Sequence, residues 1–263
     1  MKKIVVYGMS IFFAVACISA CGKKQESTSE VQKPKSDKAI PQFKFEDDSY
    51  DPNFKIPAPK KKLANYSPEG SPTRAIQDLD DMLDSYVTNP KTPEEQKYNT
   101  QLKASIIHGT FEIRELCRMA LDKNWEMRTA EEQDYFVKLM TRLLEKKAVF
   151  SKEQGQKGSG DSGGKSTTPY KITYEGEQFL DAEKSKAEVK SSVLIPSQSL
   201  RIELNYKLKK AGNEWKAFDV IVDGASLLDN YKYQFDKIIS KDGYPELVRR
   251  MESKLQAIES KNS

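Results

Sequence analysis

The stretch EWKAFDVIVDGASLLDNYKYQFDKIISKDGYPELVRRM, residues 214–251, decides the fold expected for this chain. Its first part, Trp215 to Val222, is apolar on both faces of an extended strand. We therefore predict a strand that is central in its sheet or covered on both sides. Ser226 then provides a helix N-cap, and apolar residues recur at helical spacing up to Gly243, a typical helix end. Pro245 starts a last amphipathic helix, so the stretch predicts one strand followed by two helices.

Upstream of this stretch, the apolar period changes from helical to alternating near residue 150. Helical spacing predicts four helices, at about 72–87, 93–106, 110–121 and 129–150. Alternation predicts strands at about 170–175, 186–195 and 201–208. The order of the elements predicts an α+β domain with N-terminal helices, a twisted antiparallel sheet of about four strands and two C-terminal helices.

The first 20 residues are predicted to be a lipoprotein signal peptide. Lys2 and Lys3 precede an apolar run that is too short for a stable membrane span. The run ends in Ile18-Ser19-Ala20-Cys21, which resembles the lipobox of bacterial lipoproteins, although leucine is more usual at its first position. The resemblance implies cleavage before Cys21 and lipidation of its thiol. The alternative is an ordinary signal peptide with an incidental cysteine.

Charge and composition describe the rest of the chain. Without the two signal-peptide lysines, the 43 basic residues become 41, against 39 acidic ones. A net charge of +2 is too small to give the strongly basic surface that binds nucleic acid. Residues 21–70 are interpreted as the lipidated cysteine and a disordered tether. Within them, FKFEDDSY at 43–50 is either a short docking segment or a few aromatic residues in the tether, and the second interpretation is favoured. The folded domain is predicted over 71–258, with a polar tail at 259–263.

The stretch GSGDSGGKST, residues 158–167, matches two catalytic motifs by its letters alone. GDSGG is the nucleophile motif of trypsin-like proteases, but the only histidine, His108, has none of the residues that surround a protease histidine. GGKS looks like the end of a P-loop, but that loop needs a glycine at the position of Ser159, a strand before it and a helix after it. We interpret 151–168 as an inserted surface loop and Ser162 as chemically silent.

No other group of residues in the sequence supports catalysis or metal binding. One histidine and one remaining free cysteine, Cys117, cannot assemble a zinc site. Cys117 lies among apolar residues and is interpreted as a buried, inert thiol. We therefore expect no catalytic residue, no metal site and no cofactor.

The stretch 214–251 resembles the MlaC family of periplasmic phospholipid-binding proteins. The family pattern is a tryptophan-led strand ending in Asp-Val, then Glu-Gly-Val-Ser-Leu, Asn-Tyr-Arg and Gln-Phe. The chain departs from it at Asp223, Ala225 and Lys232, and its lipobox departs from the soluble members that are better known. The resemblance covers roughly 71–258. It is carried by Trp215, Asp219, Val220, Gly224, Ser226, Leu227, Asn230, Tyr231, Gln234 and Phe235, and in the helical half by Phe111, Leu121, Trp125, Glu132, Gln133 and Phe136.

The resemblance implies a carrier that holds the acyl chains of a phospholipid in an apolar cavity between helices and sheet. The acyl chains are expected between the 129–150 helix and the inner face of the sheet, with Lys232 near the headgroup. The resemblance also implies exchange with an MCE-type transport complex, and the absence of aspartate after Cys21 favours an outer-membrane anchor. The expected wall residues are Phe111, Trp125, Phe136, Met140, Leu143, Val220, Val222, Leu228, Tyr231 and Phe235.

Two alternatives to a carrier remain open at this point. The first is a non-enzymatic envelope scaffold that keeps the fold with a filled core, because periodicity cannot distinguish a filled core from a hollow one. The second is an enzyme on a cystatin-like or NTF2-like scaffold. The lack of a catalytic constellation disfavours the enzyme.

Overall fold

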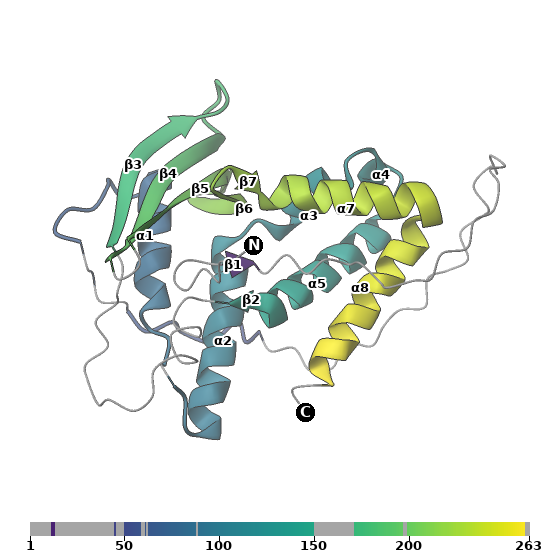
Figure 1. Cartoon of the computed structure of the whole chain (residues 1–263), viewed down its shortest axis with the longest axis horizontal. Coiled ribbons are helices and arrows are strands. Elements are labelled where there is room, and N and C mark those ends of the chain that lie inside the picture. The colour runs from purple at the N-terminus through teal and green to yellow at the C-terminus, as the bar shows by residue number, and fades with distance from the viewer. Residues whose placement is uncertain are drawn as a thin grey trace.

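The structure is a computed structural model, and it describes residues 12–13, 45, 50–58, 61, 63–87, 89–149, 171–196 and 199–260. Two groups of helices precede and follow one sheet (Figure 1). The helices before the sheet are α1 (Pro72–Leu83), α2 (Pro93–Thr110), α3 (Ile113–Leu121), α4 (Lys123–Glu126) and α5 (Ala130–Lys147). The helices after it are α7 (Leu227–Asp242) and α8 (Tyr244–Glu259).

The main sheet is antiparallel, and its strands lie side by side in the order of the chain. Its strands are β3 (Lys171–Phe179), β4 (Lys186–Ile195), β5 (Leu200–Ala211), β6 (Glu214–Val222) and the two-residue β7 (Ala225–Ser226). A separate short pair joins β1 (Phe12–Phe13) to β2 (Ala148–Val149). The predicted α+β architecture is confirmed, with four long strands as expected and β7 as a short addition.

Capping interactions fix where the long helices begin, as the sequence predicts. Before α2, the Glu95 N–H donates to the Thr92 hydroxyl, and the Thr92 N–H donates back to the Glu95 carboxylate, each over 3.2 Å. Thr129 and Glu132 exchange the same two hydrogen bonds before α5. At the other end of a helix, Gly243 has a φ of +86°, which a residue with a Cβ adopts only under strain, and it ends α7.

The start of α3 differs from the sequence prediction, which placed it near residue 110. Phe111 is extended and forms a parallel bridge with Ala217 of β6. The Glu112 N–H then donates to the Ala217 carbonyl over 2.8 Å, so the helix begins only at Ile113. Because residues 111 and 112 cover part of one edge of β6, the helical half and the sheet share a main-chain connection.

The sheet carries helices on both of its faces. Buried and more exposed residues alternate along β5, whereas Ala217 to Val220 of β6 are all buried, as expected for a strand covered on both sides. On one face, α1 packs against β3, β4 and β6, and Glu177 of β3 accepts hydrogen bonds from the Thr73 N–H and hydroxyl at the start of α1. We call this the inner face. Lys186 and Lys209 pair directly across β4 and β5 on the opposite face, where Glu115 of α3 contacts both lysines.

The corner between β6 and α7 explains several residues of the C-terminal motif. Asp219 is buried, and its carboxylate accepts hydrogen bonds from the Ser226 hydroxyl (2.8 Å) and the Leu228 N–H (3.0 Å). Desolvation raises the pKa of Asp219 above its ordinary value, against the opposing effect of these donors. Gly224 has a φ of +80° in the turn between them. The Asp-Gly-Ser spacing therefore builds a strand-to-helix corner.

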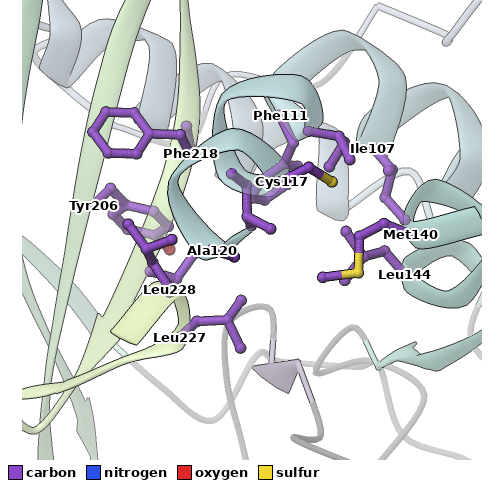
Figure 2. Packing of buried hydrophobic residues seen from close by; sticks show 14 of the residues in the cluster. Ile107, Phe111, Cys117, Ala120, Met140, Leu144, Tyr206, Phe218, Leu227 and Leu228 are labelled. Atoms are coloured by element: carbon purple, nitrogen blue, oxygen red, sulfur yellow. The ribbon is translucent and has the colours of Figure 1, made fainter. Parts of the chain in front are cut away.

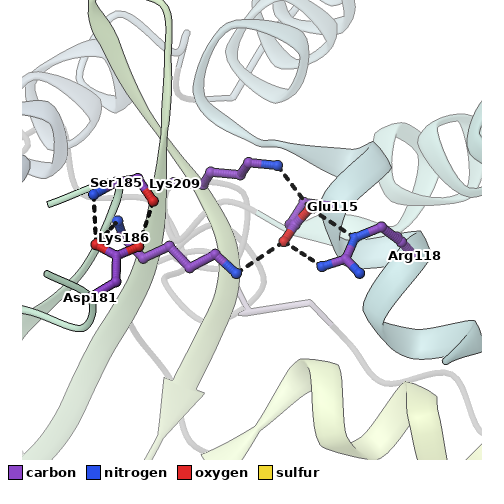
Figure 3. Close-up of polar contacts among 6 residues, drawn as sticks. All are labelled: Glu115, Arg118, Asp181, Ser185, Lys186 and Lys209. Atoms are coloured by element: carbon purple, nitrogen blue, oxygen red, sulfur yellow. Dashed lines mark hydrogen bonds and ion pairs between the residues drawn. The ribbon is translucent and has the colours of Figure 1, made fainter. Parts of the chain in front are cut away.

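Glu115 is the centre of a charge cluster between α3 and the sheet (Figure 3). Its side chain is only 4% exposed, and its carboxylate contacts the Arg118 guanidinium (2.8 Å), the Lys209 ammonium (2.9 Å) and the Lys186 ammonium (3.3 Å). The hydrogen bonds from Arg118 are the largest cause that lowers the pKa of Glu115, from about 4.5 to about 2, while burial opposes the shift. The charged form of this carboxylate therefore stabilises the fold.

Glu115→Gln is expected to lower the free energy of unfolding by about 2–3 kcal/mol at pH 7. Because the pKa of Glu115 is depressed in the folded state, its contribution is present above pH 4.5 and is lost as the pH falls toward about 2. Urea unfolding of the wild type and the variant between pH 2 and pH 7 measures this difference. Glu214→Gln is the control, because Glu214 is exposed. If the free energies of unfolding of wild type and Glu115→Gln differed by the same amount at every pH, Glu115 would not have the depressed pKa assigned to it.

Part of the segment assigned to the tether lies on the domain. Phe45, Phe54 and Ile56 pack against the core, and the Tyr50 ring stacks on the His108 imidazole. We call Phe45, residues 50–58 and residues 63–70 the strap. The structure thus supports the docking-segment interpretation of 43–50 at Phe45 and Tyr50. The sequence did not favour it, because four scattered apolar residues show no period. The predicted lipidation site Cys21, the predicted loop 151–168 and Ser162 lie outside the described residues.

Candidate functional site

An apolar layer between α1 and the inner face of the sheet is the candidate ligand site. It encloses a cavity of about 10 Å³, which has room for about one water molecule. The cavity is lined almost entirely by apolar and aromatic side chains: Ile76, Leu79 and Leu83 of α1, Ile172 and Tyr174 of β3, and Leu204 and Tyr206 of β5, with Asp80 and Ser191.

The periodicities of the elements produce this layer. Ile76, Leu79 and Leu83 recur at helical spacing and therefore share one side of α1. Alternate residues of a strand share a face, which brings Leu204 and Tyr206 of β5 together under the helix. The β3 side of the layer is the least covered, because β3 is an edge strand with Ile172 and Tyr174 only partly buried. The layer can therefore open most easily along β3.

Two of the expected wall residues lie beside this layer. Val220 pairs directly with Tyr206, and Val222 pairs with Leu204. Direct partners of an antiparallel pair point to the same face, so both valines extend the inner apolar surface onto β6. Their contact with acyl chains stays a prediction, and it is the part of the predicted wall that the geometry favours.

The other expected wall residues lie in or next to a packed helical core. The rings of Phe136 and Phe235 meet edge to face, 5.6 Å apart, and the Tyr231 ring stacks on Phe235 at 5.5 Å. Met140 and Leu228 are also buried. The remaining members of this group are Phe111 and Trp125, which are buried, and Leu143, which is partly buried.

The expectation that α5 faces the sheet needs correction. The main partners of α5 are α8, α3 and α2, and α3 lies between α5 and the sheet. Figure 2 shows Cys117 and Ala120 of α3 between Tyr206 of the sheet and Met140 of α5. The apolar side of α5 packs against other helices and not against the sheet. The helix that covers the inner face is α1.

Lys232 lies away from the apolar layer. It is half exposed on α7, and its ammonium contacts the Asp122 carboxylate at 3.1 Å, next to the turn between α3 and α4. Its proposed contact with a headgroup therefore stays a prediction. The α1 and β3 residues of the layer were not among the predicted wall residues, although helical and alternating patterns marked both elements in the sequence.

Cys117 and His108 both contribute to packing within the helical half of the domain. Cys117 is fully buried in α3, and burial raises the pKa of its thiol, as expected for an inert cysteine. His108 lies in the last turn of α2, and its Nε2 is 2.8 Å from the buried Glu145 carboxylate. Within the described residues, no three His, Cys, Asp or Glu side chains gather in a way that could hold a metal ion. Along the same parts of the chain, no helix has the length and apolar content needed to cross a bilayer.

Comparison with known proteins connects this fold to one family. The family model described as MlaC protein matches residues 77–253, from within α1 to within α8. The chain belongs to the MlaC family. No curated protein matches this MlaC chain. A solved structure with a similar fold is the phospholipid-binding protein from Ralstonia solanacearum in complex with a phospholipid. It has a TM-score of 0.50 and 19% sequence identity, and the match covers 69% of this chain and 97% of that one.

Proposed function

We propose that this MlaC chain is a phospholipid carrier of the bacterial envelope that holds acyl chains between α1 and the inner face of the sheet. The observation that carries the proposal is the apolar layer under a single helix, beside a partly exposed edge strand. The family membership supports it, and so does the similar fold of a protein solved with a bound phospholipid.

The energetics of the ligand explain what such a site must provide. Moving two acyl chains of about 30 methylenes into water costs about 24 kcal/mol, at about 0.8 kcal/mol for each methylene. A carrier must replace this contact with apolar wall over most of the chain length. The cavity of about 10 Å³ is far too small, so α1 and the sheet must separate when lipid is loaded. Val220 and Val222 then extend the wall.

The closed cavity also favours a second candidate, a non-enzymatic envelope scaffold with a filled core. The two candidates differ in one measurable property. Native mass spectrometry of the Cys21→Ser protein, purified without detergent, is expected to show the polypeptide mass plus one phospholipid. If only the bare polypeptide were found, even after incubation with phospholipid vesicles, the scaffold would be the better description.

The anchoring and the partner of the carrier belong to the same proposal. Cleavage before Cys21 and lipidation of its thiol would hold the domain on the periplasmic side of a membrane, and Gly22 in place of aspartate favours the outer membrane. Loss of residues 1–20 would also remove β1 and its pairing with β2 from the mature protein. We propose an MCE-type transport complex as the partner that gives or receives lipid, as the family suggests.

A further inference from the structure

The leading part of the strap is held on α2 and α5 by aromatic contacts. The Phe45 ring lies 5.7 Å from the Tyr135 ring of α5, and the Lys138 ammonium lies 4.7 Å above it. The Tyr50 ring is parallel to the His108 imidazole of α2, with the ring centres 3.8 Å apart. These contacts bind the strap across two helices through side chains.

The strap then crosses from α2 to α1. The Phe54 ring meets the Tyr98 ring of α2 edge to face at 5.7 Å. Ile56 packs against the core and lines a hollow of about 390 Å³ together with Ala75 and Met82 of α1. The strap therefore contacts both α2 and α1, two helices that also pack against each other.

The trailing part of the strap is hydrogen-bonded to α1. The Tyr66 hydroxyl donates to the Asp81 carboxylate over 2.5 Å, and the Ser67 N–H donates to the Gln77 side chain over 2.9 Å. Both acceptors are nearly fully buried and lie about one helical turn apart on α1. At the end of the strap, the Trp215 indole donates to the Gly70 carbonyl over 3.0 Å, which ties the strap to β6.

The contacts place α1 between two layers. Ile76, Leu79 and Leu83 face the sheet, while Gln77 and Asp81 bond to the strap. We propose that the strap is a latch that holds α1 on the sheet and must loosen before α1 can separate from it. The leading part of the strap can detach more easily than the trailing part, because its Phe45 and Phe54 rings are only partly buried. Detachment of the leading part would then loosen the trailing part, which follows it in the chain.

The double variant Tyr50→Ala/Phe54→Ala is the released-strap variant. A second variant, Tyr66→Phe, removes only the Tyr66 hydroxyl, which donates to Asp81 of α1. Tyr233→Ala is the matched control, because Tyr233 is 67% exposed on α7, away from the strap. Two signals are measured in the full chain carrying Cys21→Ser. The first is the NMR signal of His108, the only histidine in the sequence, which the stacked Tyr50 ring shifts. The second is amide hydrogen exchange in α1.

The released-strap variant is expected to move the His108 signal and to accelerate hydrogen exchange in α1 by about tenfold, the scale set by losing one or two aromatic pairs. Tyr66→Phe is expected to accelerate exchange in α1 while leaving the His108 signal in place. An unchanged His108 signal in Tyr50→Ala/Phe54→Ala would show that the strap does not dock. A moved signal with wild-type exchange in α1 would show docking without a latch, and either result overturns the proposal.

A third measurement links the latch to lipid and rests on the proposed function. The released-strap variant is expected to exchange fluorescent phospholipid with vesicles about tenfold faster than wild type, with the same amount of lipid bound. Equal exchange rates, although α1 is loosened, would contradict this link. If no lipid binds to any form, the carrier proposal fails, and the hydrogen-exchange result still decides whether the strap is a latch.

Discussion

Ile172→Asp is expected to remove bound phospholipid while the domain stays folded. Ile172 lines the apolar layer from the edge strand β3, and it is only partly buried when the layer is closed. An unpaired carboxylate facing acyl chains costs about 3 kcal/mol or more, which lowers affinity by at least roughly 100-fold. Native mass spectrometry gives the bound lipid, and circular dichroism reports whether the variant is folded.

Leu194→Asp is the matched control for this experiment. Leu194 pairs with Lys171, the neighbour of Ile172, and is 41% exposed on the opposite face of the sheet. The same charge is therefore placed close to Ile172 but on the opposite face of the sheet, where it does not meet the acyl chains, and lipid should remain bound. A folded Ile172→Asp protein with wild-type lipid content would refute the site between α1 and the sheet. Val222→Asp tests the β6 side of the wall, where loss of lipid is also expected.

Cys21→Ala is expected to release the protein from the membrane fraction. Acyl chains on a cysteine supply about 0.8 kcal/mol of membrane affinity for each buried methylene, and the variant has no thiol to carry them. Radiolabelled palmitate incorporation and membrane fractionation measure the effect. Cys17→Ala is the control, because Cys17 lies within the predicted signal peptide and should leave anchoring intact. Membrane retention of the Cys21→Ala protein at the wild-type level would contradict the lipobox interpretation.

The fold could be predicted largely from local signals in the sequence. Capping residues such as Thr92 and Thr129 have short-range hydrogen-bonding roles, so their consequences are visible without tertiary information. The same holds for the alternation along β5 and for the β6 run that is apolar on both faces. The late start of α3 at Ile113 was not predicted, because Phe111 is held extended by a bridge to Ala217, far away in the chain.

The candidate site could be predicted less well, for a physical reason. Amphipathic periodicity shows that Phe136 and Leu79 are both buried, but it does not say which surface each one packs against. Phe136 packs on Phe235 within the helices, whereas Leu79 faces the sheet. The strap escaped for a related reason, because single aromatic residues such as Tyr50 dock on surfaces that only the folded domain provides.

The bridge between Phe111 and Ala217 has a consequence for how the chain folds. The helices before the sheet can form from local contacts, but β6 gains its neighbours at 111–112 only after the C-terminal half has emerged. The indole of Trp215 bonds to a carbonyl 145 residues away, which is a similarly distant contact. Contacts of such long sequence separation slow folding, since the loop must close before they form. Until then β6, apolar on both faces, stays exposed, so newly made chains should depend on chaperones during this interval.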